Sequence, residues 1–415
     1  MTMRIVVQQM SGNVTTVEAY PDMTMGEFKR QLKASQEWED DLTKRLTMVD
    51  LLMGDTQLID DDHTVMQAGL SEDVALDVLF RVRLIECKTK EDLSCLSGDV
   101  EELFAVSIPE DTWDIPMFAF KNCNSIGSVT ISNGVHLIRE HAFDGCSSLT
   151  RLTIPDSVTR IEPQAFAGCR SLTSVTIPDT VNSIGLQAFA GCRSLASLTI
   201  SAEVTQIAEA AFRCCSSLTS LRIPKSVTNI GDQAFAGCSA LRHLEIPGSV
   251  TNIGPRAFSG CGSLTSLKIP NSVTNIGDAA FRGCRSVTSF MVPDSVTELR
   301  EGTFDSCCSL TSLRIPDTVT SIGDWAFANC STLTSLTLPE SLTSIGHQAF
   351  SDCSSLTSLR IPDAVTKIGR KAFEGCSSLT LSVHSDIAEM VPAHCVSLRS
   401  RSVFTSDETI REVEQ

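Results

Sequence analysis

Positive charge is scarce in this sequence, and its scarcity limits what the chain can bind. The 415 residues include 33 lysines and arginines against 50 aspartates and glutamates, a formal net charge of −17. Nucleic acids and anionic lipid surfaces both require a cationic face, so neither is an expected partner. Most of the excess negative charge lies before residue 121, which indicates a boundary near that point between two regions of different composition.

The sequence also lacks long apolar runs. None approaches the ~18 residues that a membrane-spanning helix needs. The segment from Met1 to Met10 contains Arg4 and two glutamines, so it does not have the apolar stretch of a secretory signal. We therefore expect a cytoplasmic protein without a membrane span.

Motifs for metal and cofactor binding are missing as well. The 17 cysteines never form a Cys-x2-Cys pair, and the seven histidines follow no ligand spacing, so no metal site is predicted. The glycines do not cluster as they do in a phosphate-binding loop. We expect no metal, no cofactor and no catalytic residue.

What the sequence does contain is a repeat of 23 residues. Phenylalanine recurs at this interval from Phe120 to Phe373, and a cysteine follows three residues later in each of twelve copies, without insertion or deletion. A representative unit, residues 218–240, reads LTSLRIPKSVTNIGDQAFAGCSA. The spacing of Leu221 and Ile223 predicts a short strand with one buried face, which Pro224 ends. The fixed period is typical of a solenoid, whose units bury their apolar residues against one another.

The repeat makes specific predictions about packing. Strands of successive units should lie parallel, about 4.8 Å apart, in a right-handed solenoid with one internal column of phenylalanines and another of cysteines. The cysteines should be buried, reduced thiols that pack as small hydrophobes. We expect a compact helical or 3-10 segment at each Ala-Phe pair. Phe290 and Met291 are expected to interrupt the strand of their unit.

The unit, written L-x-x-L-x-I-P…I-G…A-F-x-G-C, resembles the leucine-rich repeats of BspA-type proteins over about residues 109–398. This resemblance implies an arc that is used for protein recognition and has no catalytic activity. Residues 379–398 form a degenerate copy that we interpret as a C-terminal cap, followed by a polar tail at 399–415. The acidic residues 84–108 are interpreted as a linker and N-terminal cap.

Residues 1–83 have a different pattern. Met3, Ile5 and Val7 alternate with polar residues, and Val14 to Ala19 is predicted to return as the second strand of a hairpin. Thr24 and Glu27 have the spacing of a capping box at the start of a helix. The order of these elements resembles a ubiquitin-like β-grasp domain. The predicted fold is therefore an α+β ubiquitin-like domain followed by a leucine-rich-repeat solenoid with a parallel β-sheet.

The ubiquitin-like resemblance carries its own functional implications. Thr47 stands where ubiquitin has the isoleucine of its recognition patch, whereas Leu79 keeps another patch position. Leu84 and Ile85 follow Arg83 where ubiquitin ends in two glycines. The resemblance thus implies a domain that cannot be conjugated and that engages ubiquitin- or proteasome-pathway machinery.

The exposed side of the predicted sheet carries the candidate binding residues. Between the second and third apolar positions of each strand lies a residue that should face the concave side of the solenoid. Most units have serine or threonine along this side, and the exceptions are residues with long or charged side chains. The alternative is a plain solvated surface. The predicted protein-binding stripe consists of Arg151, Arg222, Arg242, His243, Glu245, Lys268, Met291, Arg314 and Arg360.

Three functions are compatible with these patterns. The first is a non-enzymatic scaffold or adaptor whose basic stripe binds an acidic protein partner, or the acidic residues 84–120 of the same chain. The second is a secreted or surface-exposed recognition or adhesion protein, as BspA-type relatives often are. The third is a cysteine enzyme that transfers ubiquitin through Cys87, Cys95 or Cys395, but the sequence offers no base or orienting partner for any of them. The oligomeric state is not specified by the sequence.

Overall fold

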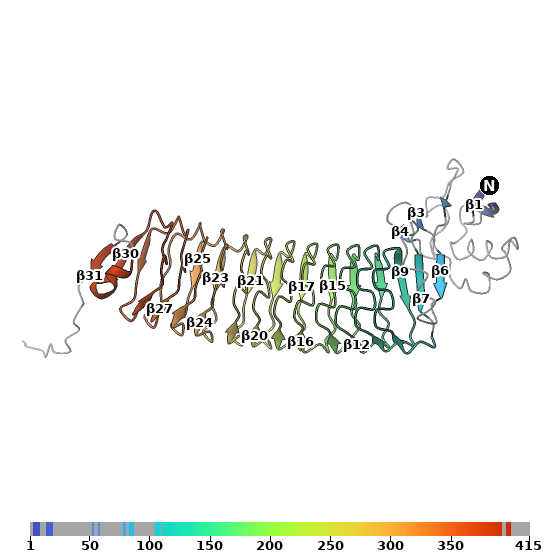
Figure 1. Cartoon of the computed structure of the whole chain (residues 1–415), viewed down its shortest axis with the longest axis horizontal. Helices are drawn as coiled ribbons and strands as arrows, with labels where there is room; N and C mark the ends of the chain where they lie inside the picture. The colour runs from blue at the N-terminus through green and yellow to red at the C-terminus, as the bar shows by residue number, and fades with distance from the viewer. Residues whose placement is uncertain are drawn as a thin grey trace, which may run out of the picture.

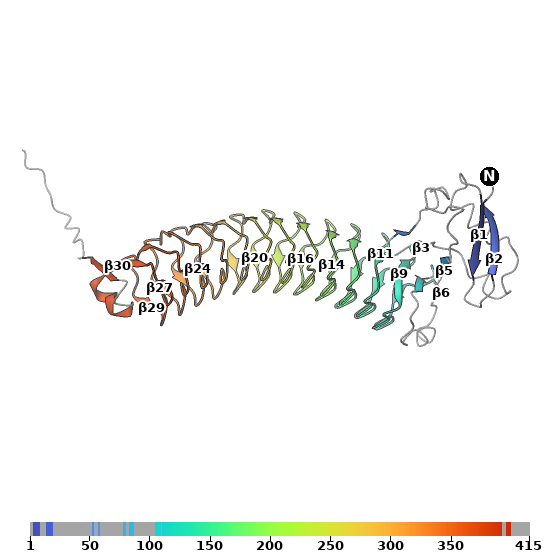
Figure 2. The same cartoon turned by 90° about the horizontal axis from the view of Figure 1, so that it is seen from above.

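The computed structural model describes residues 110–391 continuously and, outside this range, residues 3–8, 14–19, 52–53, 57–58, 78–79, 83–86, 104–108 and 396–399. Residues 110–391 form one elongated solenoid, seen from the side in Figure 1. From above, the row of units is bent into an arc (Figure 2). Two ladders of parallel strands lie along the solenoid, one of longer and one of shorter strands, and each ladder is divided into several hydrogen-bonded sheets.

The longer strands have the register that the 23-residue period predicts. Leu221 pairs with Leu244, which pairs with Leu267 of the next unit, all in parallel. Within a typical three-residue strand the middle side chain is buried and the outer two are exposed. The prediction of parallel strands is confirmed. The longer strands of the central units are β9 (Ile126–Ile131), β11 (Arg151–Thr153), β13 (Ser174–Thr176), β15 (Ser197–Thr199), β17 (Ser220–Arg222), β19 (His243–Glu245), β21 (Ser266–Lys268), β23 (Ser289–Met291), β25 (Ser312–Arg314) and β28 (Ser358–Arg360).

The second ladder was not predicted from the sequence. Most neighbouring units pair two residues, such as Asn229 and Ile230, with their counterparts 23 residues away. The isoleucine is buried, and the preceding residue is partly or fully exposed. These strands are β8 (Asp114–Ile115), β10 (Leu137–Ile138), β12 (Arg160–Ile161), β14 (Ser183–Ile184), β16 (Gln206–Ile207), β18 (Asn229–Ile230), β20 (Asn252–Ile253), β22 (Asn275–Ile276), β24 (Glu298–Leu299), β26 (Ser321–Ile322), β27 (Ser344–Ile345) and β29 (Lys367–Ile368).

Further strands extend the longer ladder at both ends. β6 (Arg83–Glu86) pairs in parallel with β7 (Phe104–Ile108), which pairs with β9. At the other end, β30 (Thr380–His384) pairs in parallel with β28 and with β31 (Val396–Arg399), and the 3-10 helix η3 (Ser385–Met390) lies between β30 and β31 in the chain. Parallel pairing thus continues into the segments that we interpreted as caps, in one sheet at each end.

The residues that are described before Arg83 form two small sets of strands. β1 (Met3–Gln8) pairs antiparallel with β2 (Val14–Ala19), as the predicted hairpin requires, and parallel with β5 (Val78–Leu79). β3 (Leu52–Met53) pairs antiparallel with β4 (Gln57–Leu58). The helix predicted after Thr24 and the patch residue Thr47 lie outside the described residues.

A continuous stack of phenylalanine rings forms the centre of the core. Neighbouring rings from Phe120 to Phe373 lie 4.8–5.9 Å apart between centroids and within 14° of parallel. All twelve side chains are buried. The predicted column is confirmed.

The unit with Phe290 corrects one prediction. Residues 289–291 form β23, which pairs in parallel with β25, so Phe290 and Met291 do not interrupt the strand. Phe290 replaces the usual leucine at a buried position, and its ring packs edge-on against Phe304 at 4.6 Å. The larger side chain is accommodated because it continues the aromatic core.

The helical segment expected at each Ala-Phe pair is also corrected. The residues two positions before and two positions after each ladder phenylalanine have positive φ in all twelve units, for example 53° at Gln233 and 77° at Gly237. A right-handed helix requires negative φ throughout. The segment is therefore a pair of tight turns, in which the amide of Cys238 donates to the carbonyl of Phe235.

Candidate protein-binding surface

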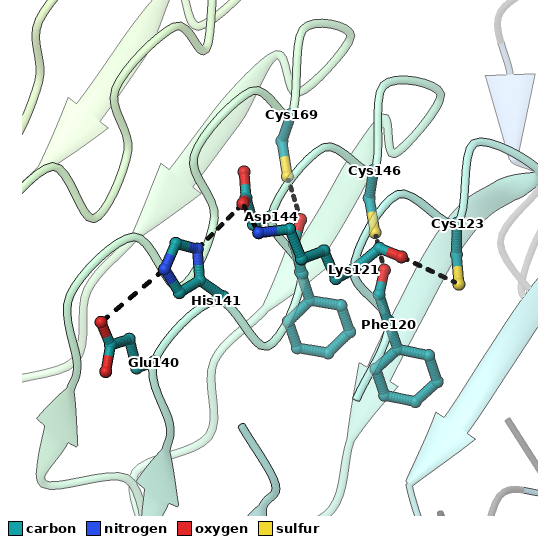
Figure 3. Close-up of polar contacts among 9 residues, drawn as sticks. Phe120, Lys121, Cys123, Glu140, His141, Asp144, Cys146 and Cys169 are labelled. Atoms are coloured by element: carbon teal, nitrogen blue, oxygen red, sulfur yellow. Dashed lines mark hydrogen bonds and ion pairs between the residues drawn. The ribbon is translucent and has the colours of Figure 1, made fainter. Parts of the chain in front are cut away.

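The cysteine ladder is structural. Eleven of its thiols donate to the carbonyl of the phenylalanine 26 residues earlier, with distances from 3.0 Å for Cys146 to 3.4 Å for Cys238. Figure 3 shows Cys146 directed at the Phe120 carbonyl. Burial raises the pKa of Cys192 and of Cys261 to about 12. The ladder cysteines are buried free thiols, as predicted.

Thiol labelling provides a direct test of this arrangement. We expect iodoacetamide at pH 8 to modify Cys214, which is exposed, and more slowly Cys308, which is half-buried. The ladder thiols from Cys146 to Cys330 should remain unmodified, because burial keeps the reagent away and raises their pKa, to about 12 for Cys192 and Cys261. Peptide mapping by mass spectrometry measures each site, and denaturation should make all 17 cysteines reactive. Labelling of Cys238 as fast as Cys214 in the native protein would contradict the buried ladder.

The described residues offer little for other site chemistries. Within them, no three histidine, cysteine or acidic side chains are grouped closely enough to hold a metal ion. No helix in this part of the chain has the length and apolar character to cross a bilayer. Cys87, Cys95 and Cys395, the candidates for a cysteine enzyme, lie outside the described residues.

The predicted stripe lies on the exposed side of the longer strands, which we call the long-strand face. The third residues of five consecutive strands, β17 to β25, place long side chains next to one another: Arg222, Glu245, Lys268, Met291 and Arg314. Arg360 holds the same position in β28, Arg151 and His243 hold first positions, and Arg242 directly precedes β19. All nine side chains are exposed, as the alternation of the strand predicts.

Two of the arginines are already paired with acidic side chains. Arg314 lies 3.1 Å from Asp294, and Arg360 contacts Glu340. In both cases the carboxylate lies 20 residues earlier, in a turn of the preceding unit. The corresponding positions for Arg222 and Lys268 are Ala202 and Gly248, and neither cation forms an ion pair within the described part of the chain.

The part of the face around Arg222 and Lys268, which form no ion pair among the described residues, therefore combines charged side chains with an apolar one. Arg222 pairs in register with Glu245, which pairs with Lys268, so the charges alternate in sign across three strands. Met291 follows in the next unit and is 66% exposed. Such a mixture is suited to a protein surface, because methionine packs adaptably while the charges set orientation.

A second exposed cluster near the first units was missed by sequence reasoning. Trp113 stacks on His136 at 3.9 Å and Phe118 stacks on His141 at 4.9 Å. Figure 3 shows the His141 ring directed at Asp144, 2.9 Å away, which also pairs with Lys121. The signal was present in the sequence, since Phe118 and His141 occupy the position that is most often glutamine in later units.

Comparisons with known proteins identify the repeat. The chain matches the family model described as BspA type leucine rich repeat region in overlapping segments from residue 99 to residue 409. No curated protein matches it. A leucine-rich repeat protein from Bacteroides ovatus is 29% identical, with a TM-score of 0.59 over 72% of this chain and 84% of that one.

Two further solved structures are similar. A leucine rich cell surface protein from Faecalibacterium prausnitzii is 32% identical over 69% of this chain and 82% of that one, with a TM-score of 0.45. The pneumococcal vaccine antigen PcpA shares the fold, with 16% identity and a TM-score of 0.51 over 74% of this chain and 82% of that one. Because the family model spans well over half of the sequence, the chain belongs to the BspA-type leucine-rich repeat family.

Proposed function

We propose that this protein is a non-enzymatic interaction scaffold that binds a protein partner through the long-strand face between Arg222 and Arg314. The observation that carries this proposal is the run of long side chains on five consecutive strands, where most other units have serine or threonine. Leucine-rich repeat and other solenoid proteins commonly bind their partners on extended sheet surfaces. The proposed partner is acidic at its contact, since Arg222 and Lys268 have no paired carboxylate in the described chain.

The rigidity of the face supports this role. Its side chains project from strands about 4.8 Å apart, and the strands rest on the buried phenylalanine stack. Few groups of this face therefore become ordered when a partner binds, which lowers the entropy loss of association. Met291 offers the apolar contact around which the charges are arranged.

Charge reversal tests the proposal. Arg222→Glu combined with Lys268→Glu should weaken partner capture from lysate about tenfold at low salt, mainly through slower association. The matched control is Arg314→Glu with Arg360→Glu, which should have a smaller effect because Asp294 and Glu340 already neutralise these arginines. Equal retention of the same partners by both variants, with unchanged salt dependence, would rule the face out as the binding surface.

We further propose that the N-terminal region is a ubiquitin-like domain that engages ubiquitin- or proteasome-pathway machinery. The strand order β2-β1-β5, with one antiparallel and one parallel pairing, supports this assignment because a β-grasp sheet begins this way. Leu79 belongs to β5. Leu84 and Ile85 belong to β6 of the solenoid sheet, which supports a domain that is not conjugated. If Leu79→Ala left binding to purified proteasomal ubiquitin receptors unchanged, the patch assignment would fail.

A cytoplasmic location is proposed on the basis of the reduced ladder, because free thiols are retained in reducing compartments. The alternative, a surface-exposed recognition protein, is favoured by the solved cell surface protein from Faecalibacterium prausnitzii. Labelling of intact source cells with a membrane-impermeant amine reagent separates the two. Modification of this chain as rapid as that of a known surface protein would favour the alternative.

A further inference from the structure

A groove lies on a different part of the solenoid, among the loops that carry the phenylalanine and cysteine ladders. It has a volume of about 720 Å³ and runs across five units, from Pro255 to Asp352. At the spacing of stacked strands this is a length of about 20 Å. The volume is within the usual range for small-molecule sites.

The groove arises from a change in one column of side chains. The residue two positions before each ladder phenylalanine is Gln233 and Arg256 in successive units, but the next two units have Ala279 and Gly302. Two small residues in succession leave a hollow beside the following member of the column, Trp325. This tryptophan is 37% exposed and lines the groove.

Polar side chains in the lining are held in fixed positions. The buried carboxylate of Asp305 lies 2.9 Å from Nε of Arg282 and accepts a hydrogen bond from Nδ2 of Asn329 at 3.0 Å. Nε1 of Trp325 donates to Oε1 of Gln348 at 2.9 Å. The tryptophan ring and the amides are therefore oriented before any ligand arrives, which reduces the entropy lost on binding.

The edge of the groove has further hydrogen-bonding groups, in a position where most units have glycine. The left-handed position two residues after the phenylalanine is glycine in most units, but Ser306, Asn329 and Asp352 occupy it in three consecutive units, with φ near 60°. Asn329 and Asp352 line the groove, and all three line an adjoining hollow. Along one edge of the groove, residues with hydroxyl, amide and carboxylate side chains thus stand in place of glycine.

We infer that this groove binds a neutral oligosaccharide. A sugar ring presents an apolar C–H face, which fits the flat indole of Trp325, and hydroxyls around its edge, which need both donors and acceptors. The lining supplies both kinds of group: Arg282 and Asn329 carry donors, and Asp352 and Gln348 carry acceptors. The charged groups of the lining are Arg256, Arg282, Asp278, Glu301, Asp305 and Asp352, so an anion would meet four carboxylates and a cation two guanidinium groups. The site is separate from the long-strand face and goes beyond the scaffold function.

Calorimetric titration of the full chain with cellohexaose, maltohexaose, mannohexaose and chitohexaose tests the inference, with hexalysine as a cationic probe. At least one hexasaccharide should bind with Kd below about 1 mM, and Trp325→Gln should weaken that binding about tenfold. Gly302→Gln should abolish it by filling the hollow. Both variants introduce the residue that Gln233 and Gln348 provide in the same column at φ of 53° and 49°, so the fold should be retained.

Trp113→Gln serves as the control, because it removes an exposed tryptophan outside the groove and should leave sugar binding unchanged. Unchanged thermal unfolding of all three variants would show that any loss is local. The inference is overturned if no hexasaccharide binds, or if binding survives Trp325→Gln and Gly302→Gln. Binding of hexalysine alone, weakened by Trp325→Gln, would instead assign the groove to a cationic peptide.

Discussion

Phe235→Ala is expected to lower the free energy of unfolding by about 3–5 kcal/mol, the usual result of emptying a ring-sized space in a core. Phe235 is fully buried, and its ring lies 5.5 Å from those of Phe212 and Phe258. The cavity cannot close easily, because the backbone on both sides is fixed by two ladders of parallel strands. The loss should be concentrated in the adjoining units, since each unit contacts only its neighbours.

Hydrogen exchange with mass spectrometry measures where the stability is lost. Amides in the units of Phe212, Phe235 and Phe258 should exchange much faster in the variant, while units near Phe350 change little. Phe118→Ala is the matched control, because this phenylalanine is 45% exposed and outside the stack. Its effect should be at most about 1 kcal/mol. Uniform loosening from one end of the solenoid to the other would contradict a nearest-neighbour column.

Gly277→Ala should be the other severe substitution, with a loss of about 3 kcal/mol. A Cβ at this position would lie 2.3 Å from the backbone nitrogen of Pro255 and 2.6 Å from the carbonyl carbon of Gly254. Both atoms belong to the preceding unit, so the two units must move apart to admit one methyl group. The stacking of backbones is therefore close at Gly277, whereas Ala208 and Arg300 occupy the corresponding position in two other units.

The control for this substitution is Gly262→Ala, a glycine in the same region with no heavy atom within 4 Å of the added Cβ. It should be neutral or slightly stabilising, because alanine reduces the conformational freedom of the unfolded chain. Urea unfolding of the full chain, compared at the midpoint, gives both values. Equal midpoints for the two variants would show that stacking at Gly277 is looser than the distances indicate.

The parts of the fold that follow from repetition could be predicted from the sequence. A strict 23-residue period forces Phe235 to lie beside Phe212 and Phe258, and Leu221 beside Leu244, whatever the conformation between them. The exposure of Arg222 and Lys268 follows in the same way from alternation along a strand. Register and burial are therefore set by the pattern alone.

The remaining features depend on conformations that the residue types do not favour. Gln233 adopts a φ of 53°, which is uncommon for glutamine, so the tight turns resembled a helical segment in the sequence. The short strands contain two residues each, too few to show an alternating pattern. The ion pair of Arg314 with Asp294 links residues 20 positions apart, a spacing that has meaning only when the units are stacked.

Site-specific photo-crosslinking can show whether the long-strand face is the protein-binding surface. A photoreactive amino acid would replace Met291 on this face or Thr274, an exposed residue next to the short strand β22. The full-length proteins would be illuminated in lysate and the crosslinked proteins identified by mass spectrometry. We expect a defined partner to be crosslinked from position 291, to be lost with Arg222→Glu and Lys268→Glu, and to be absent from position 274. The same partner crosslinked from position 274 and not from position 291 would contradict this expectation.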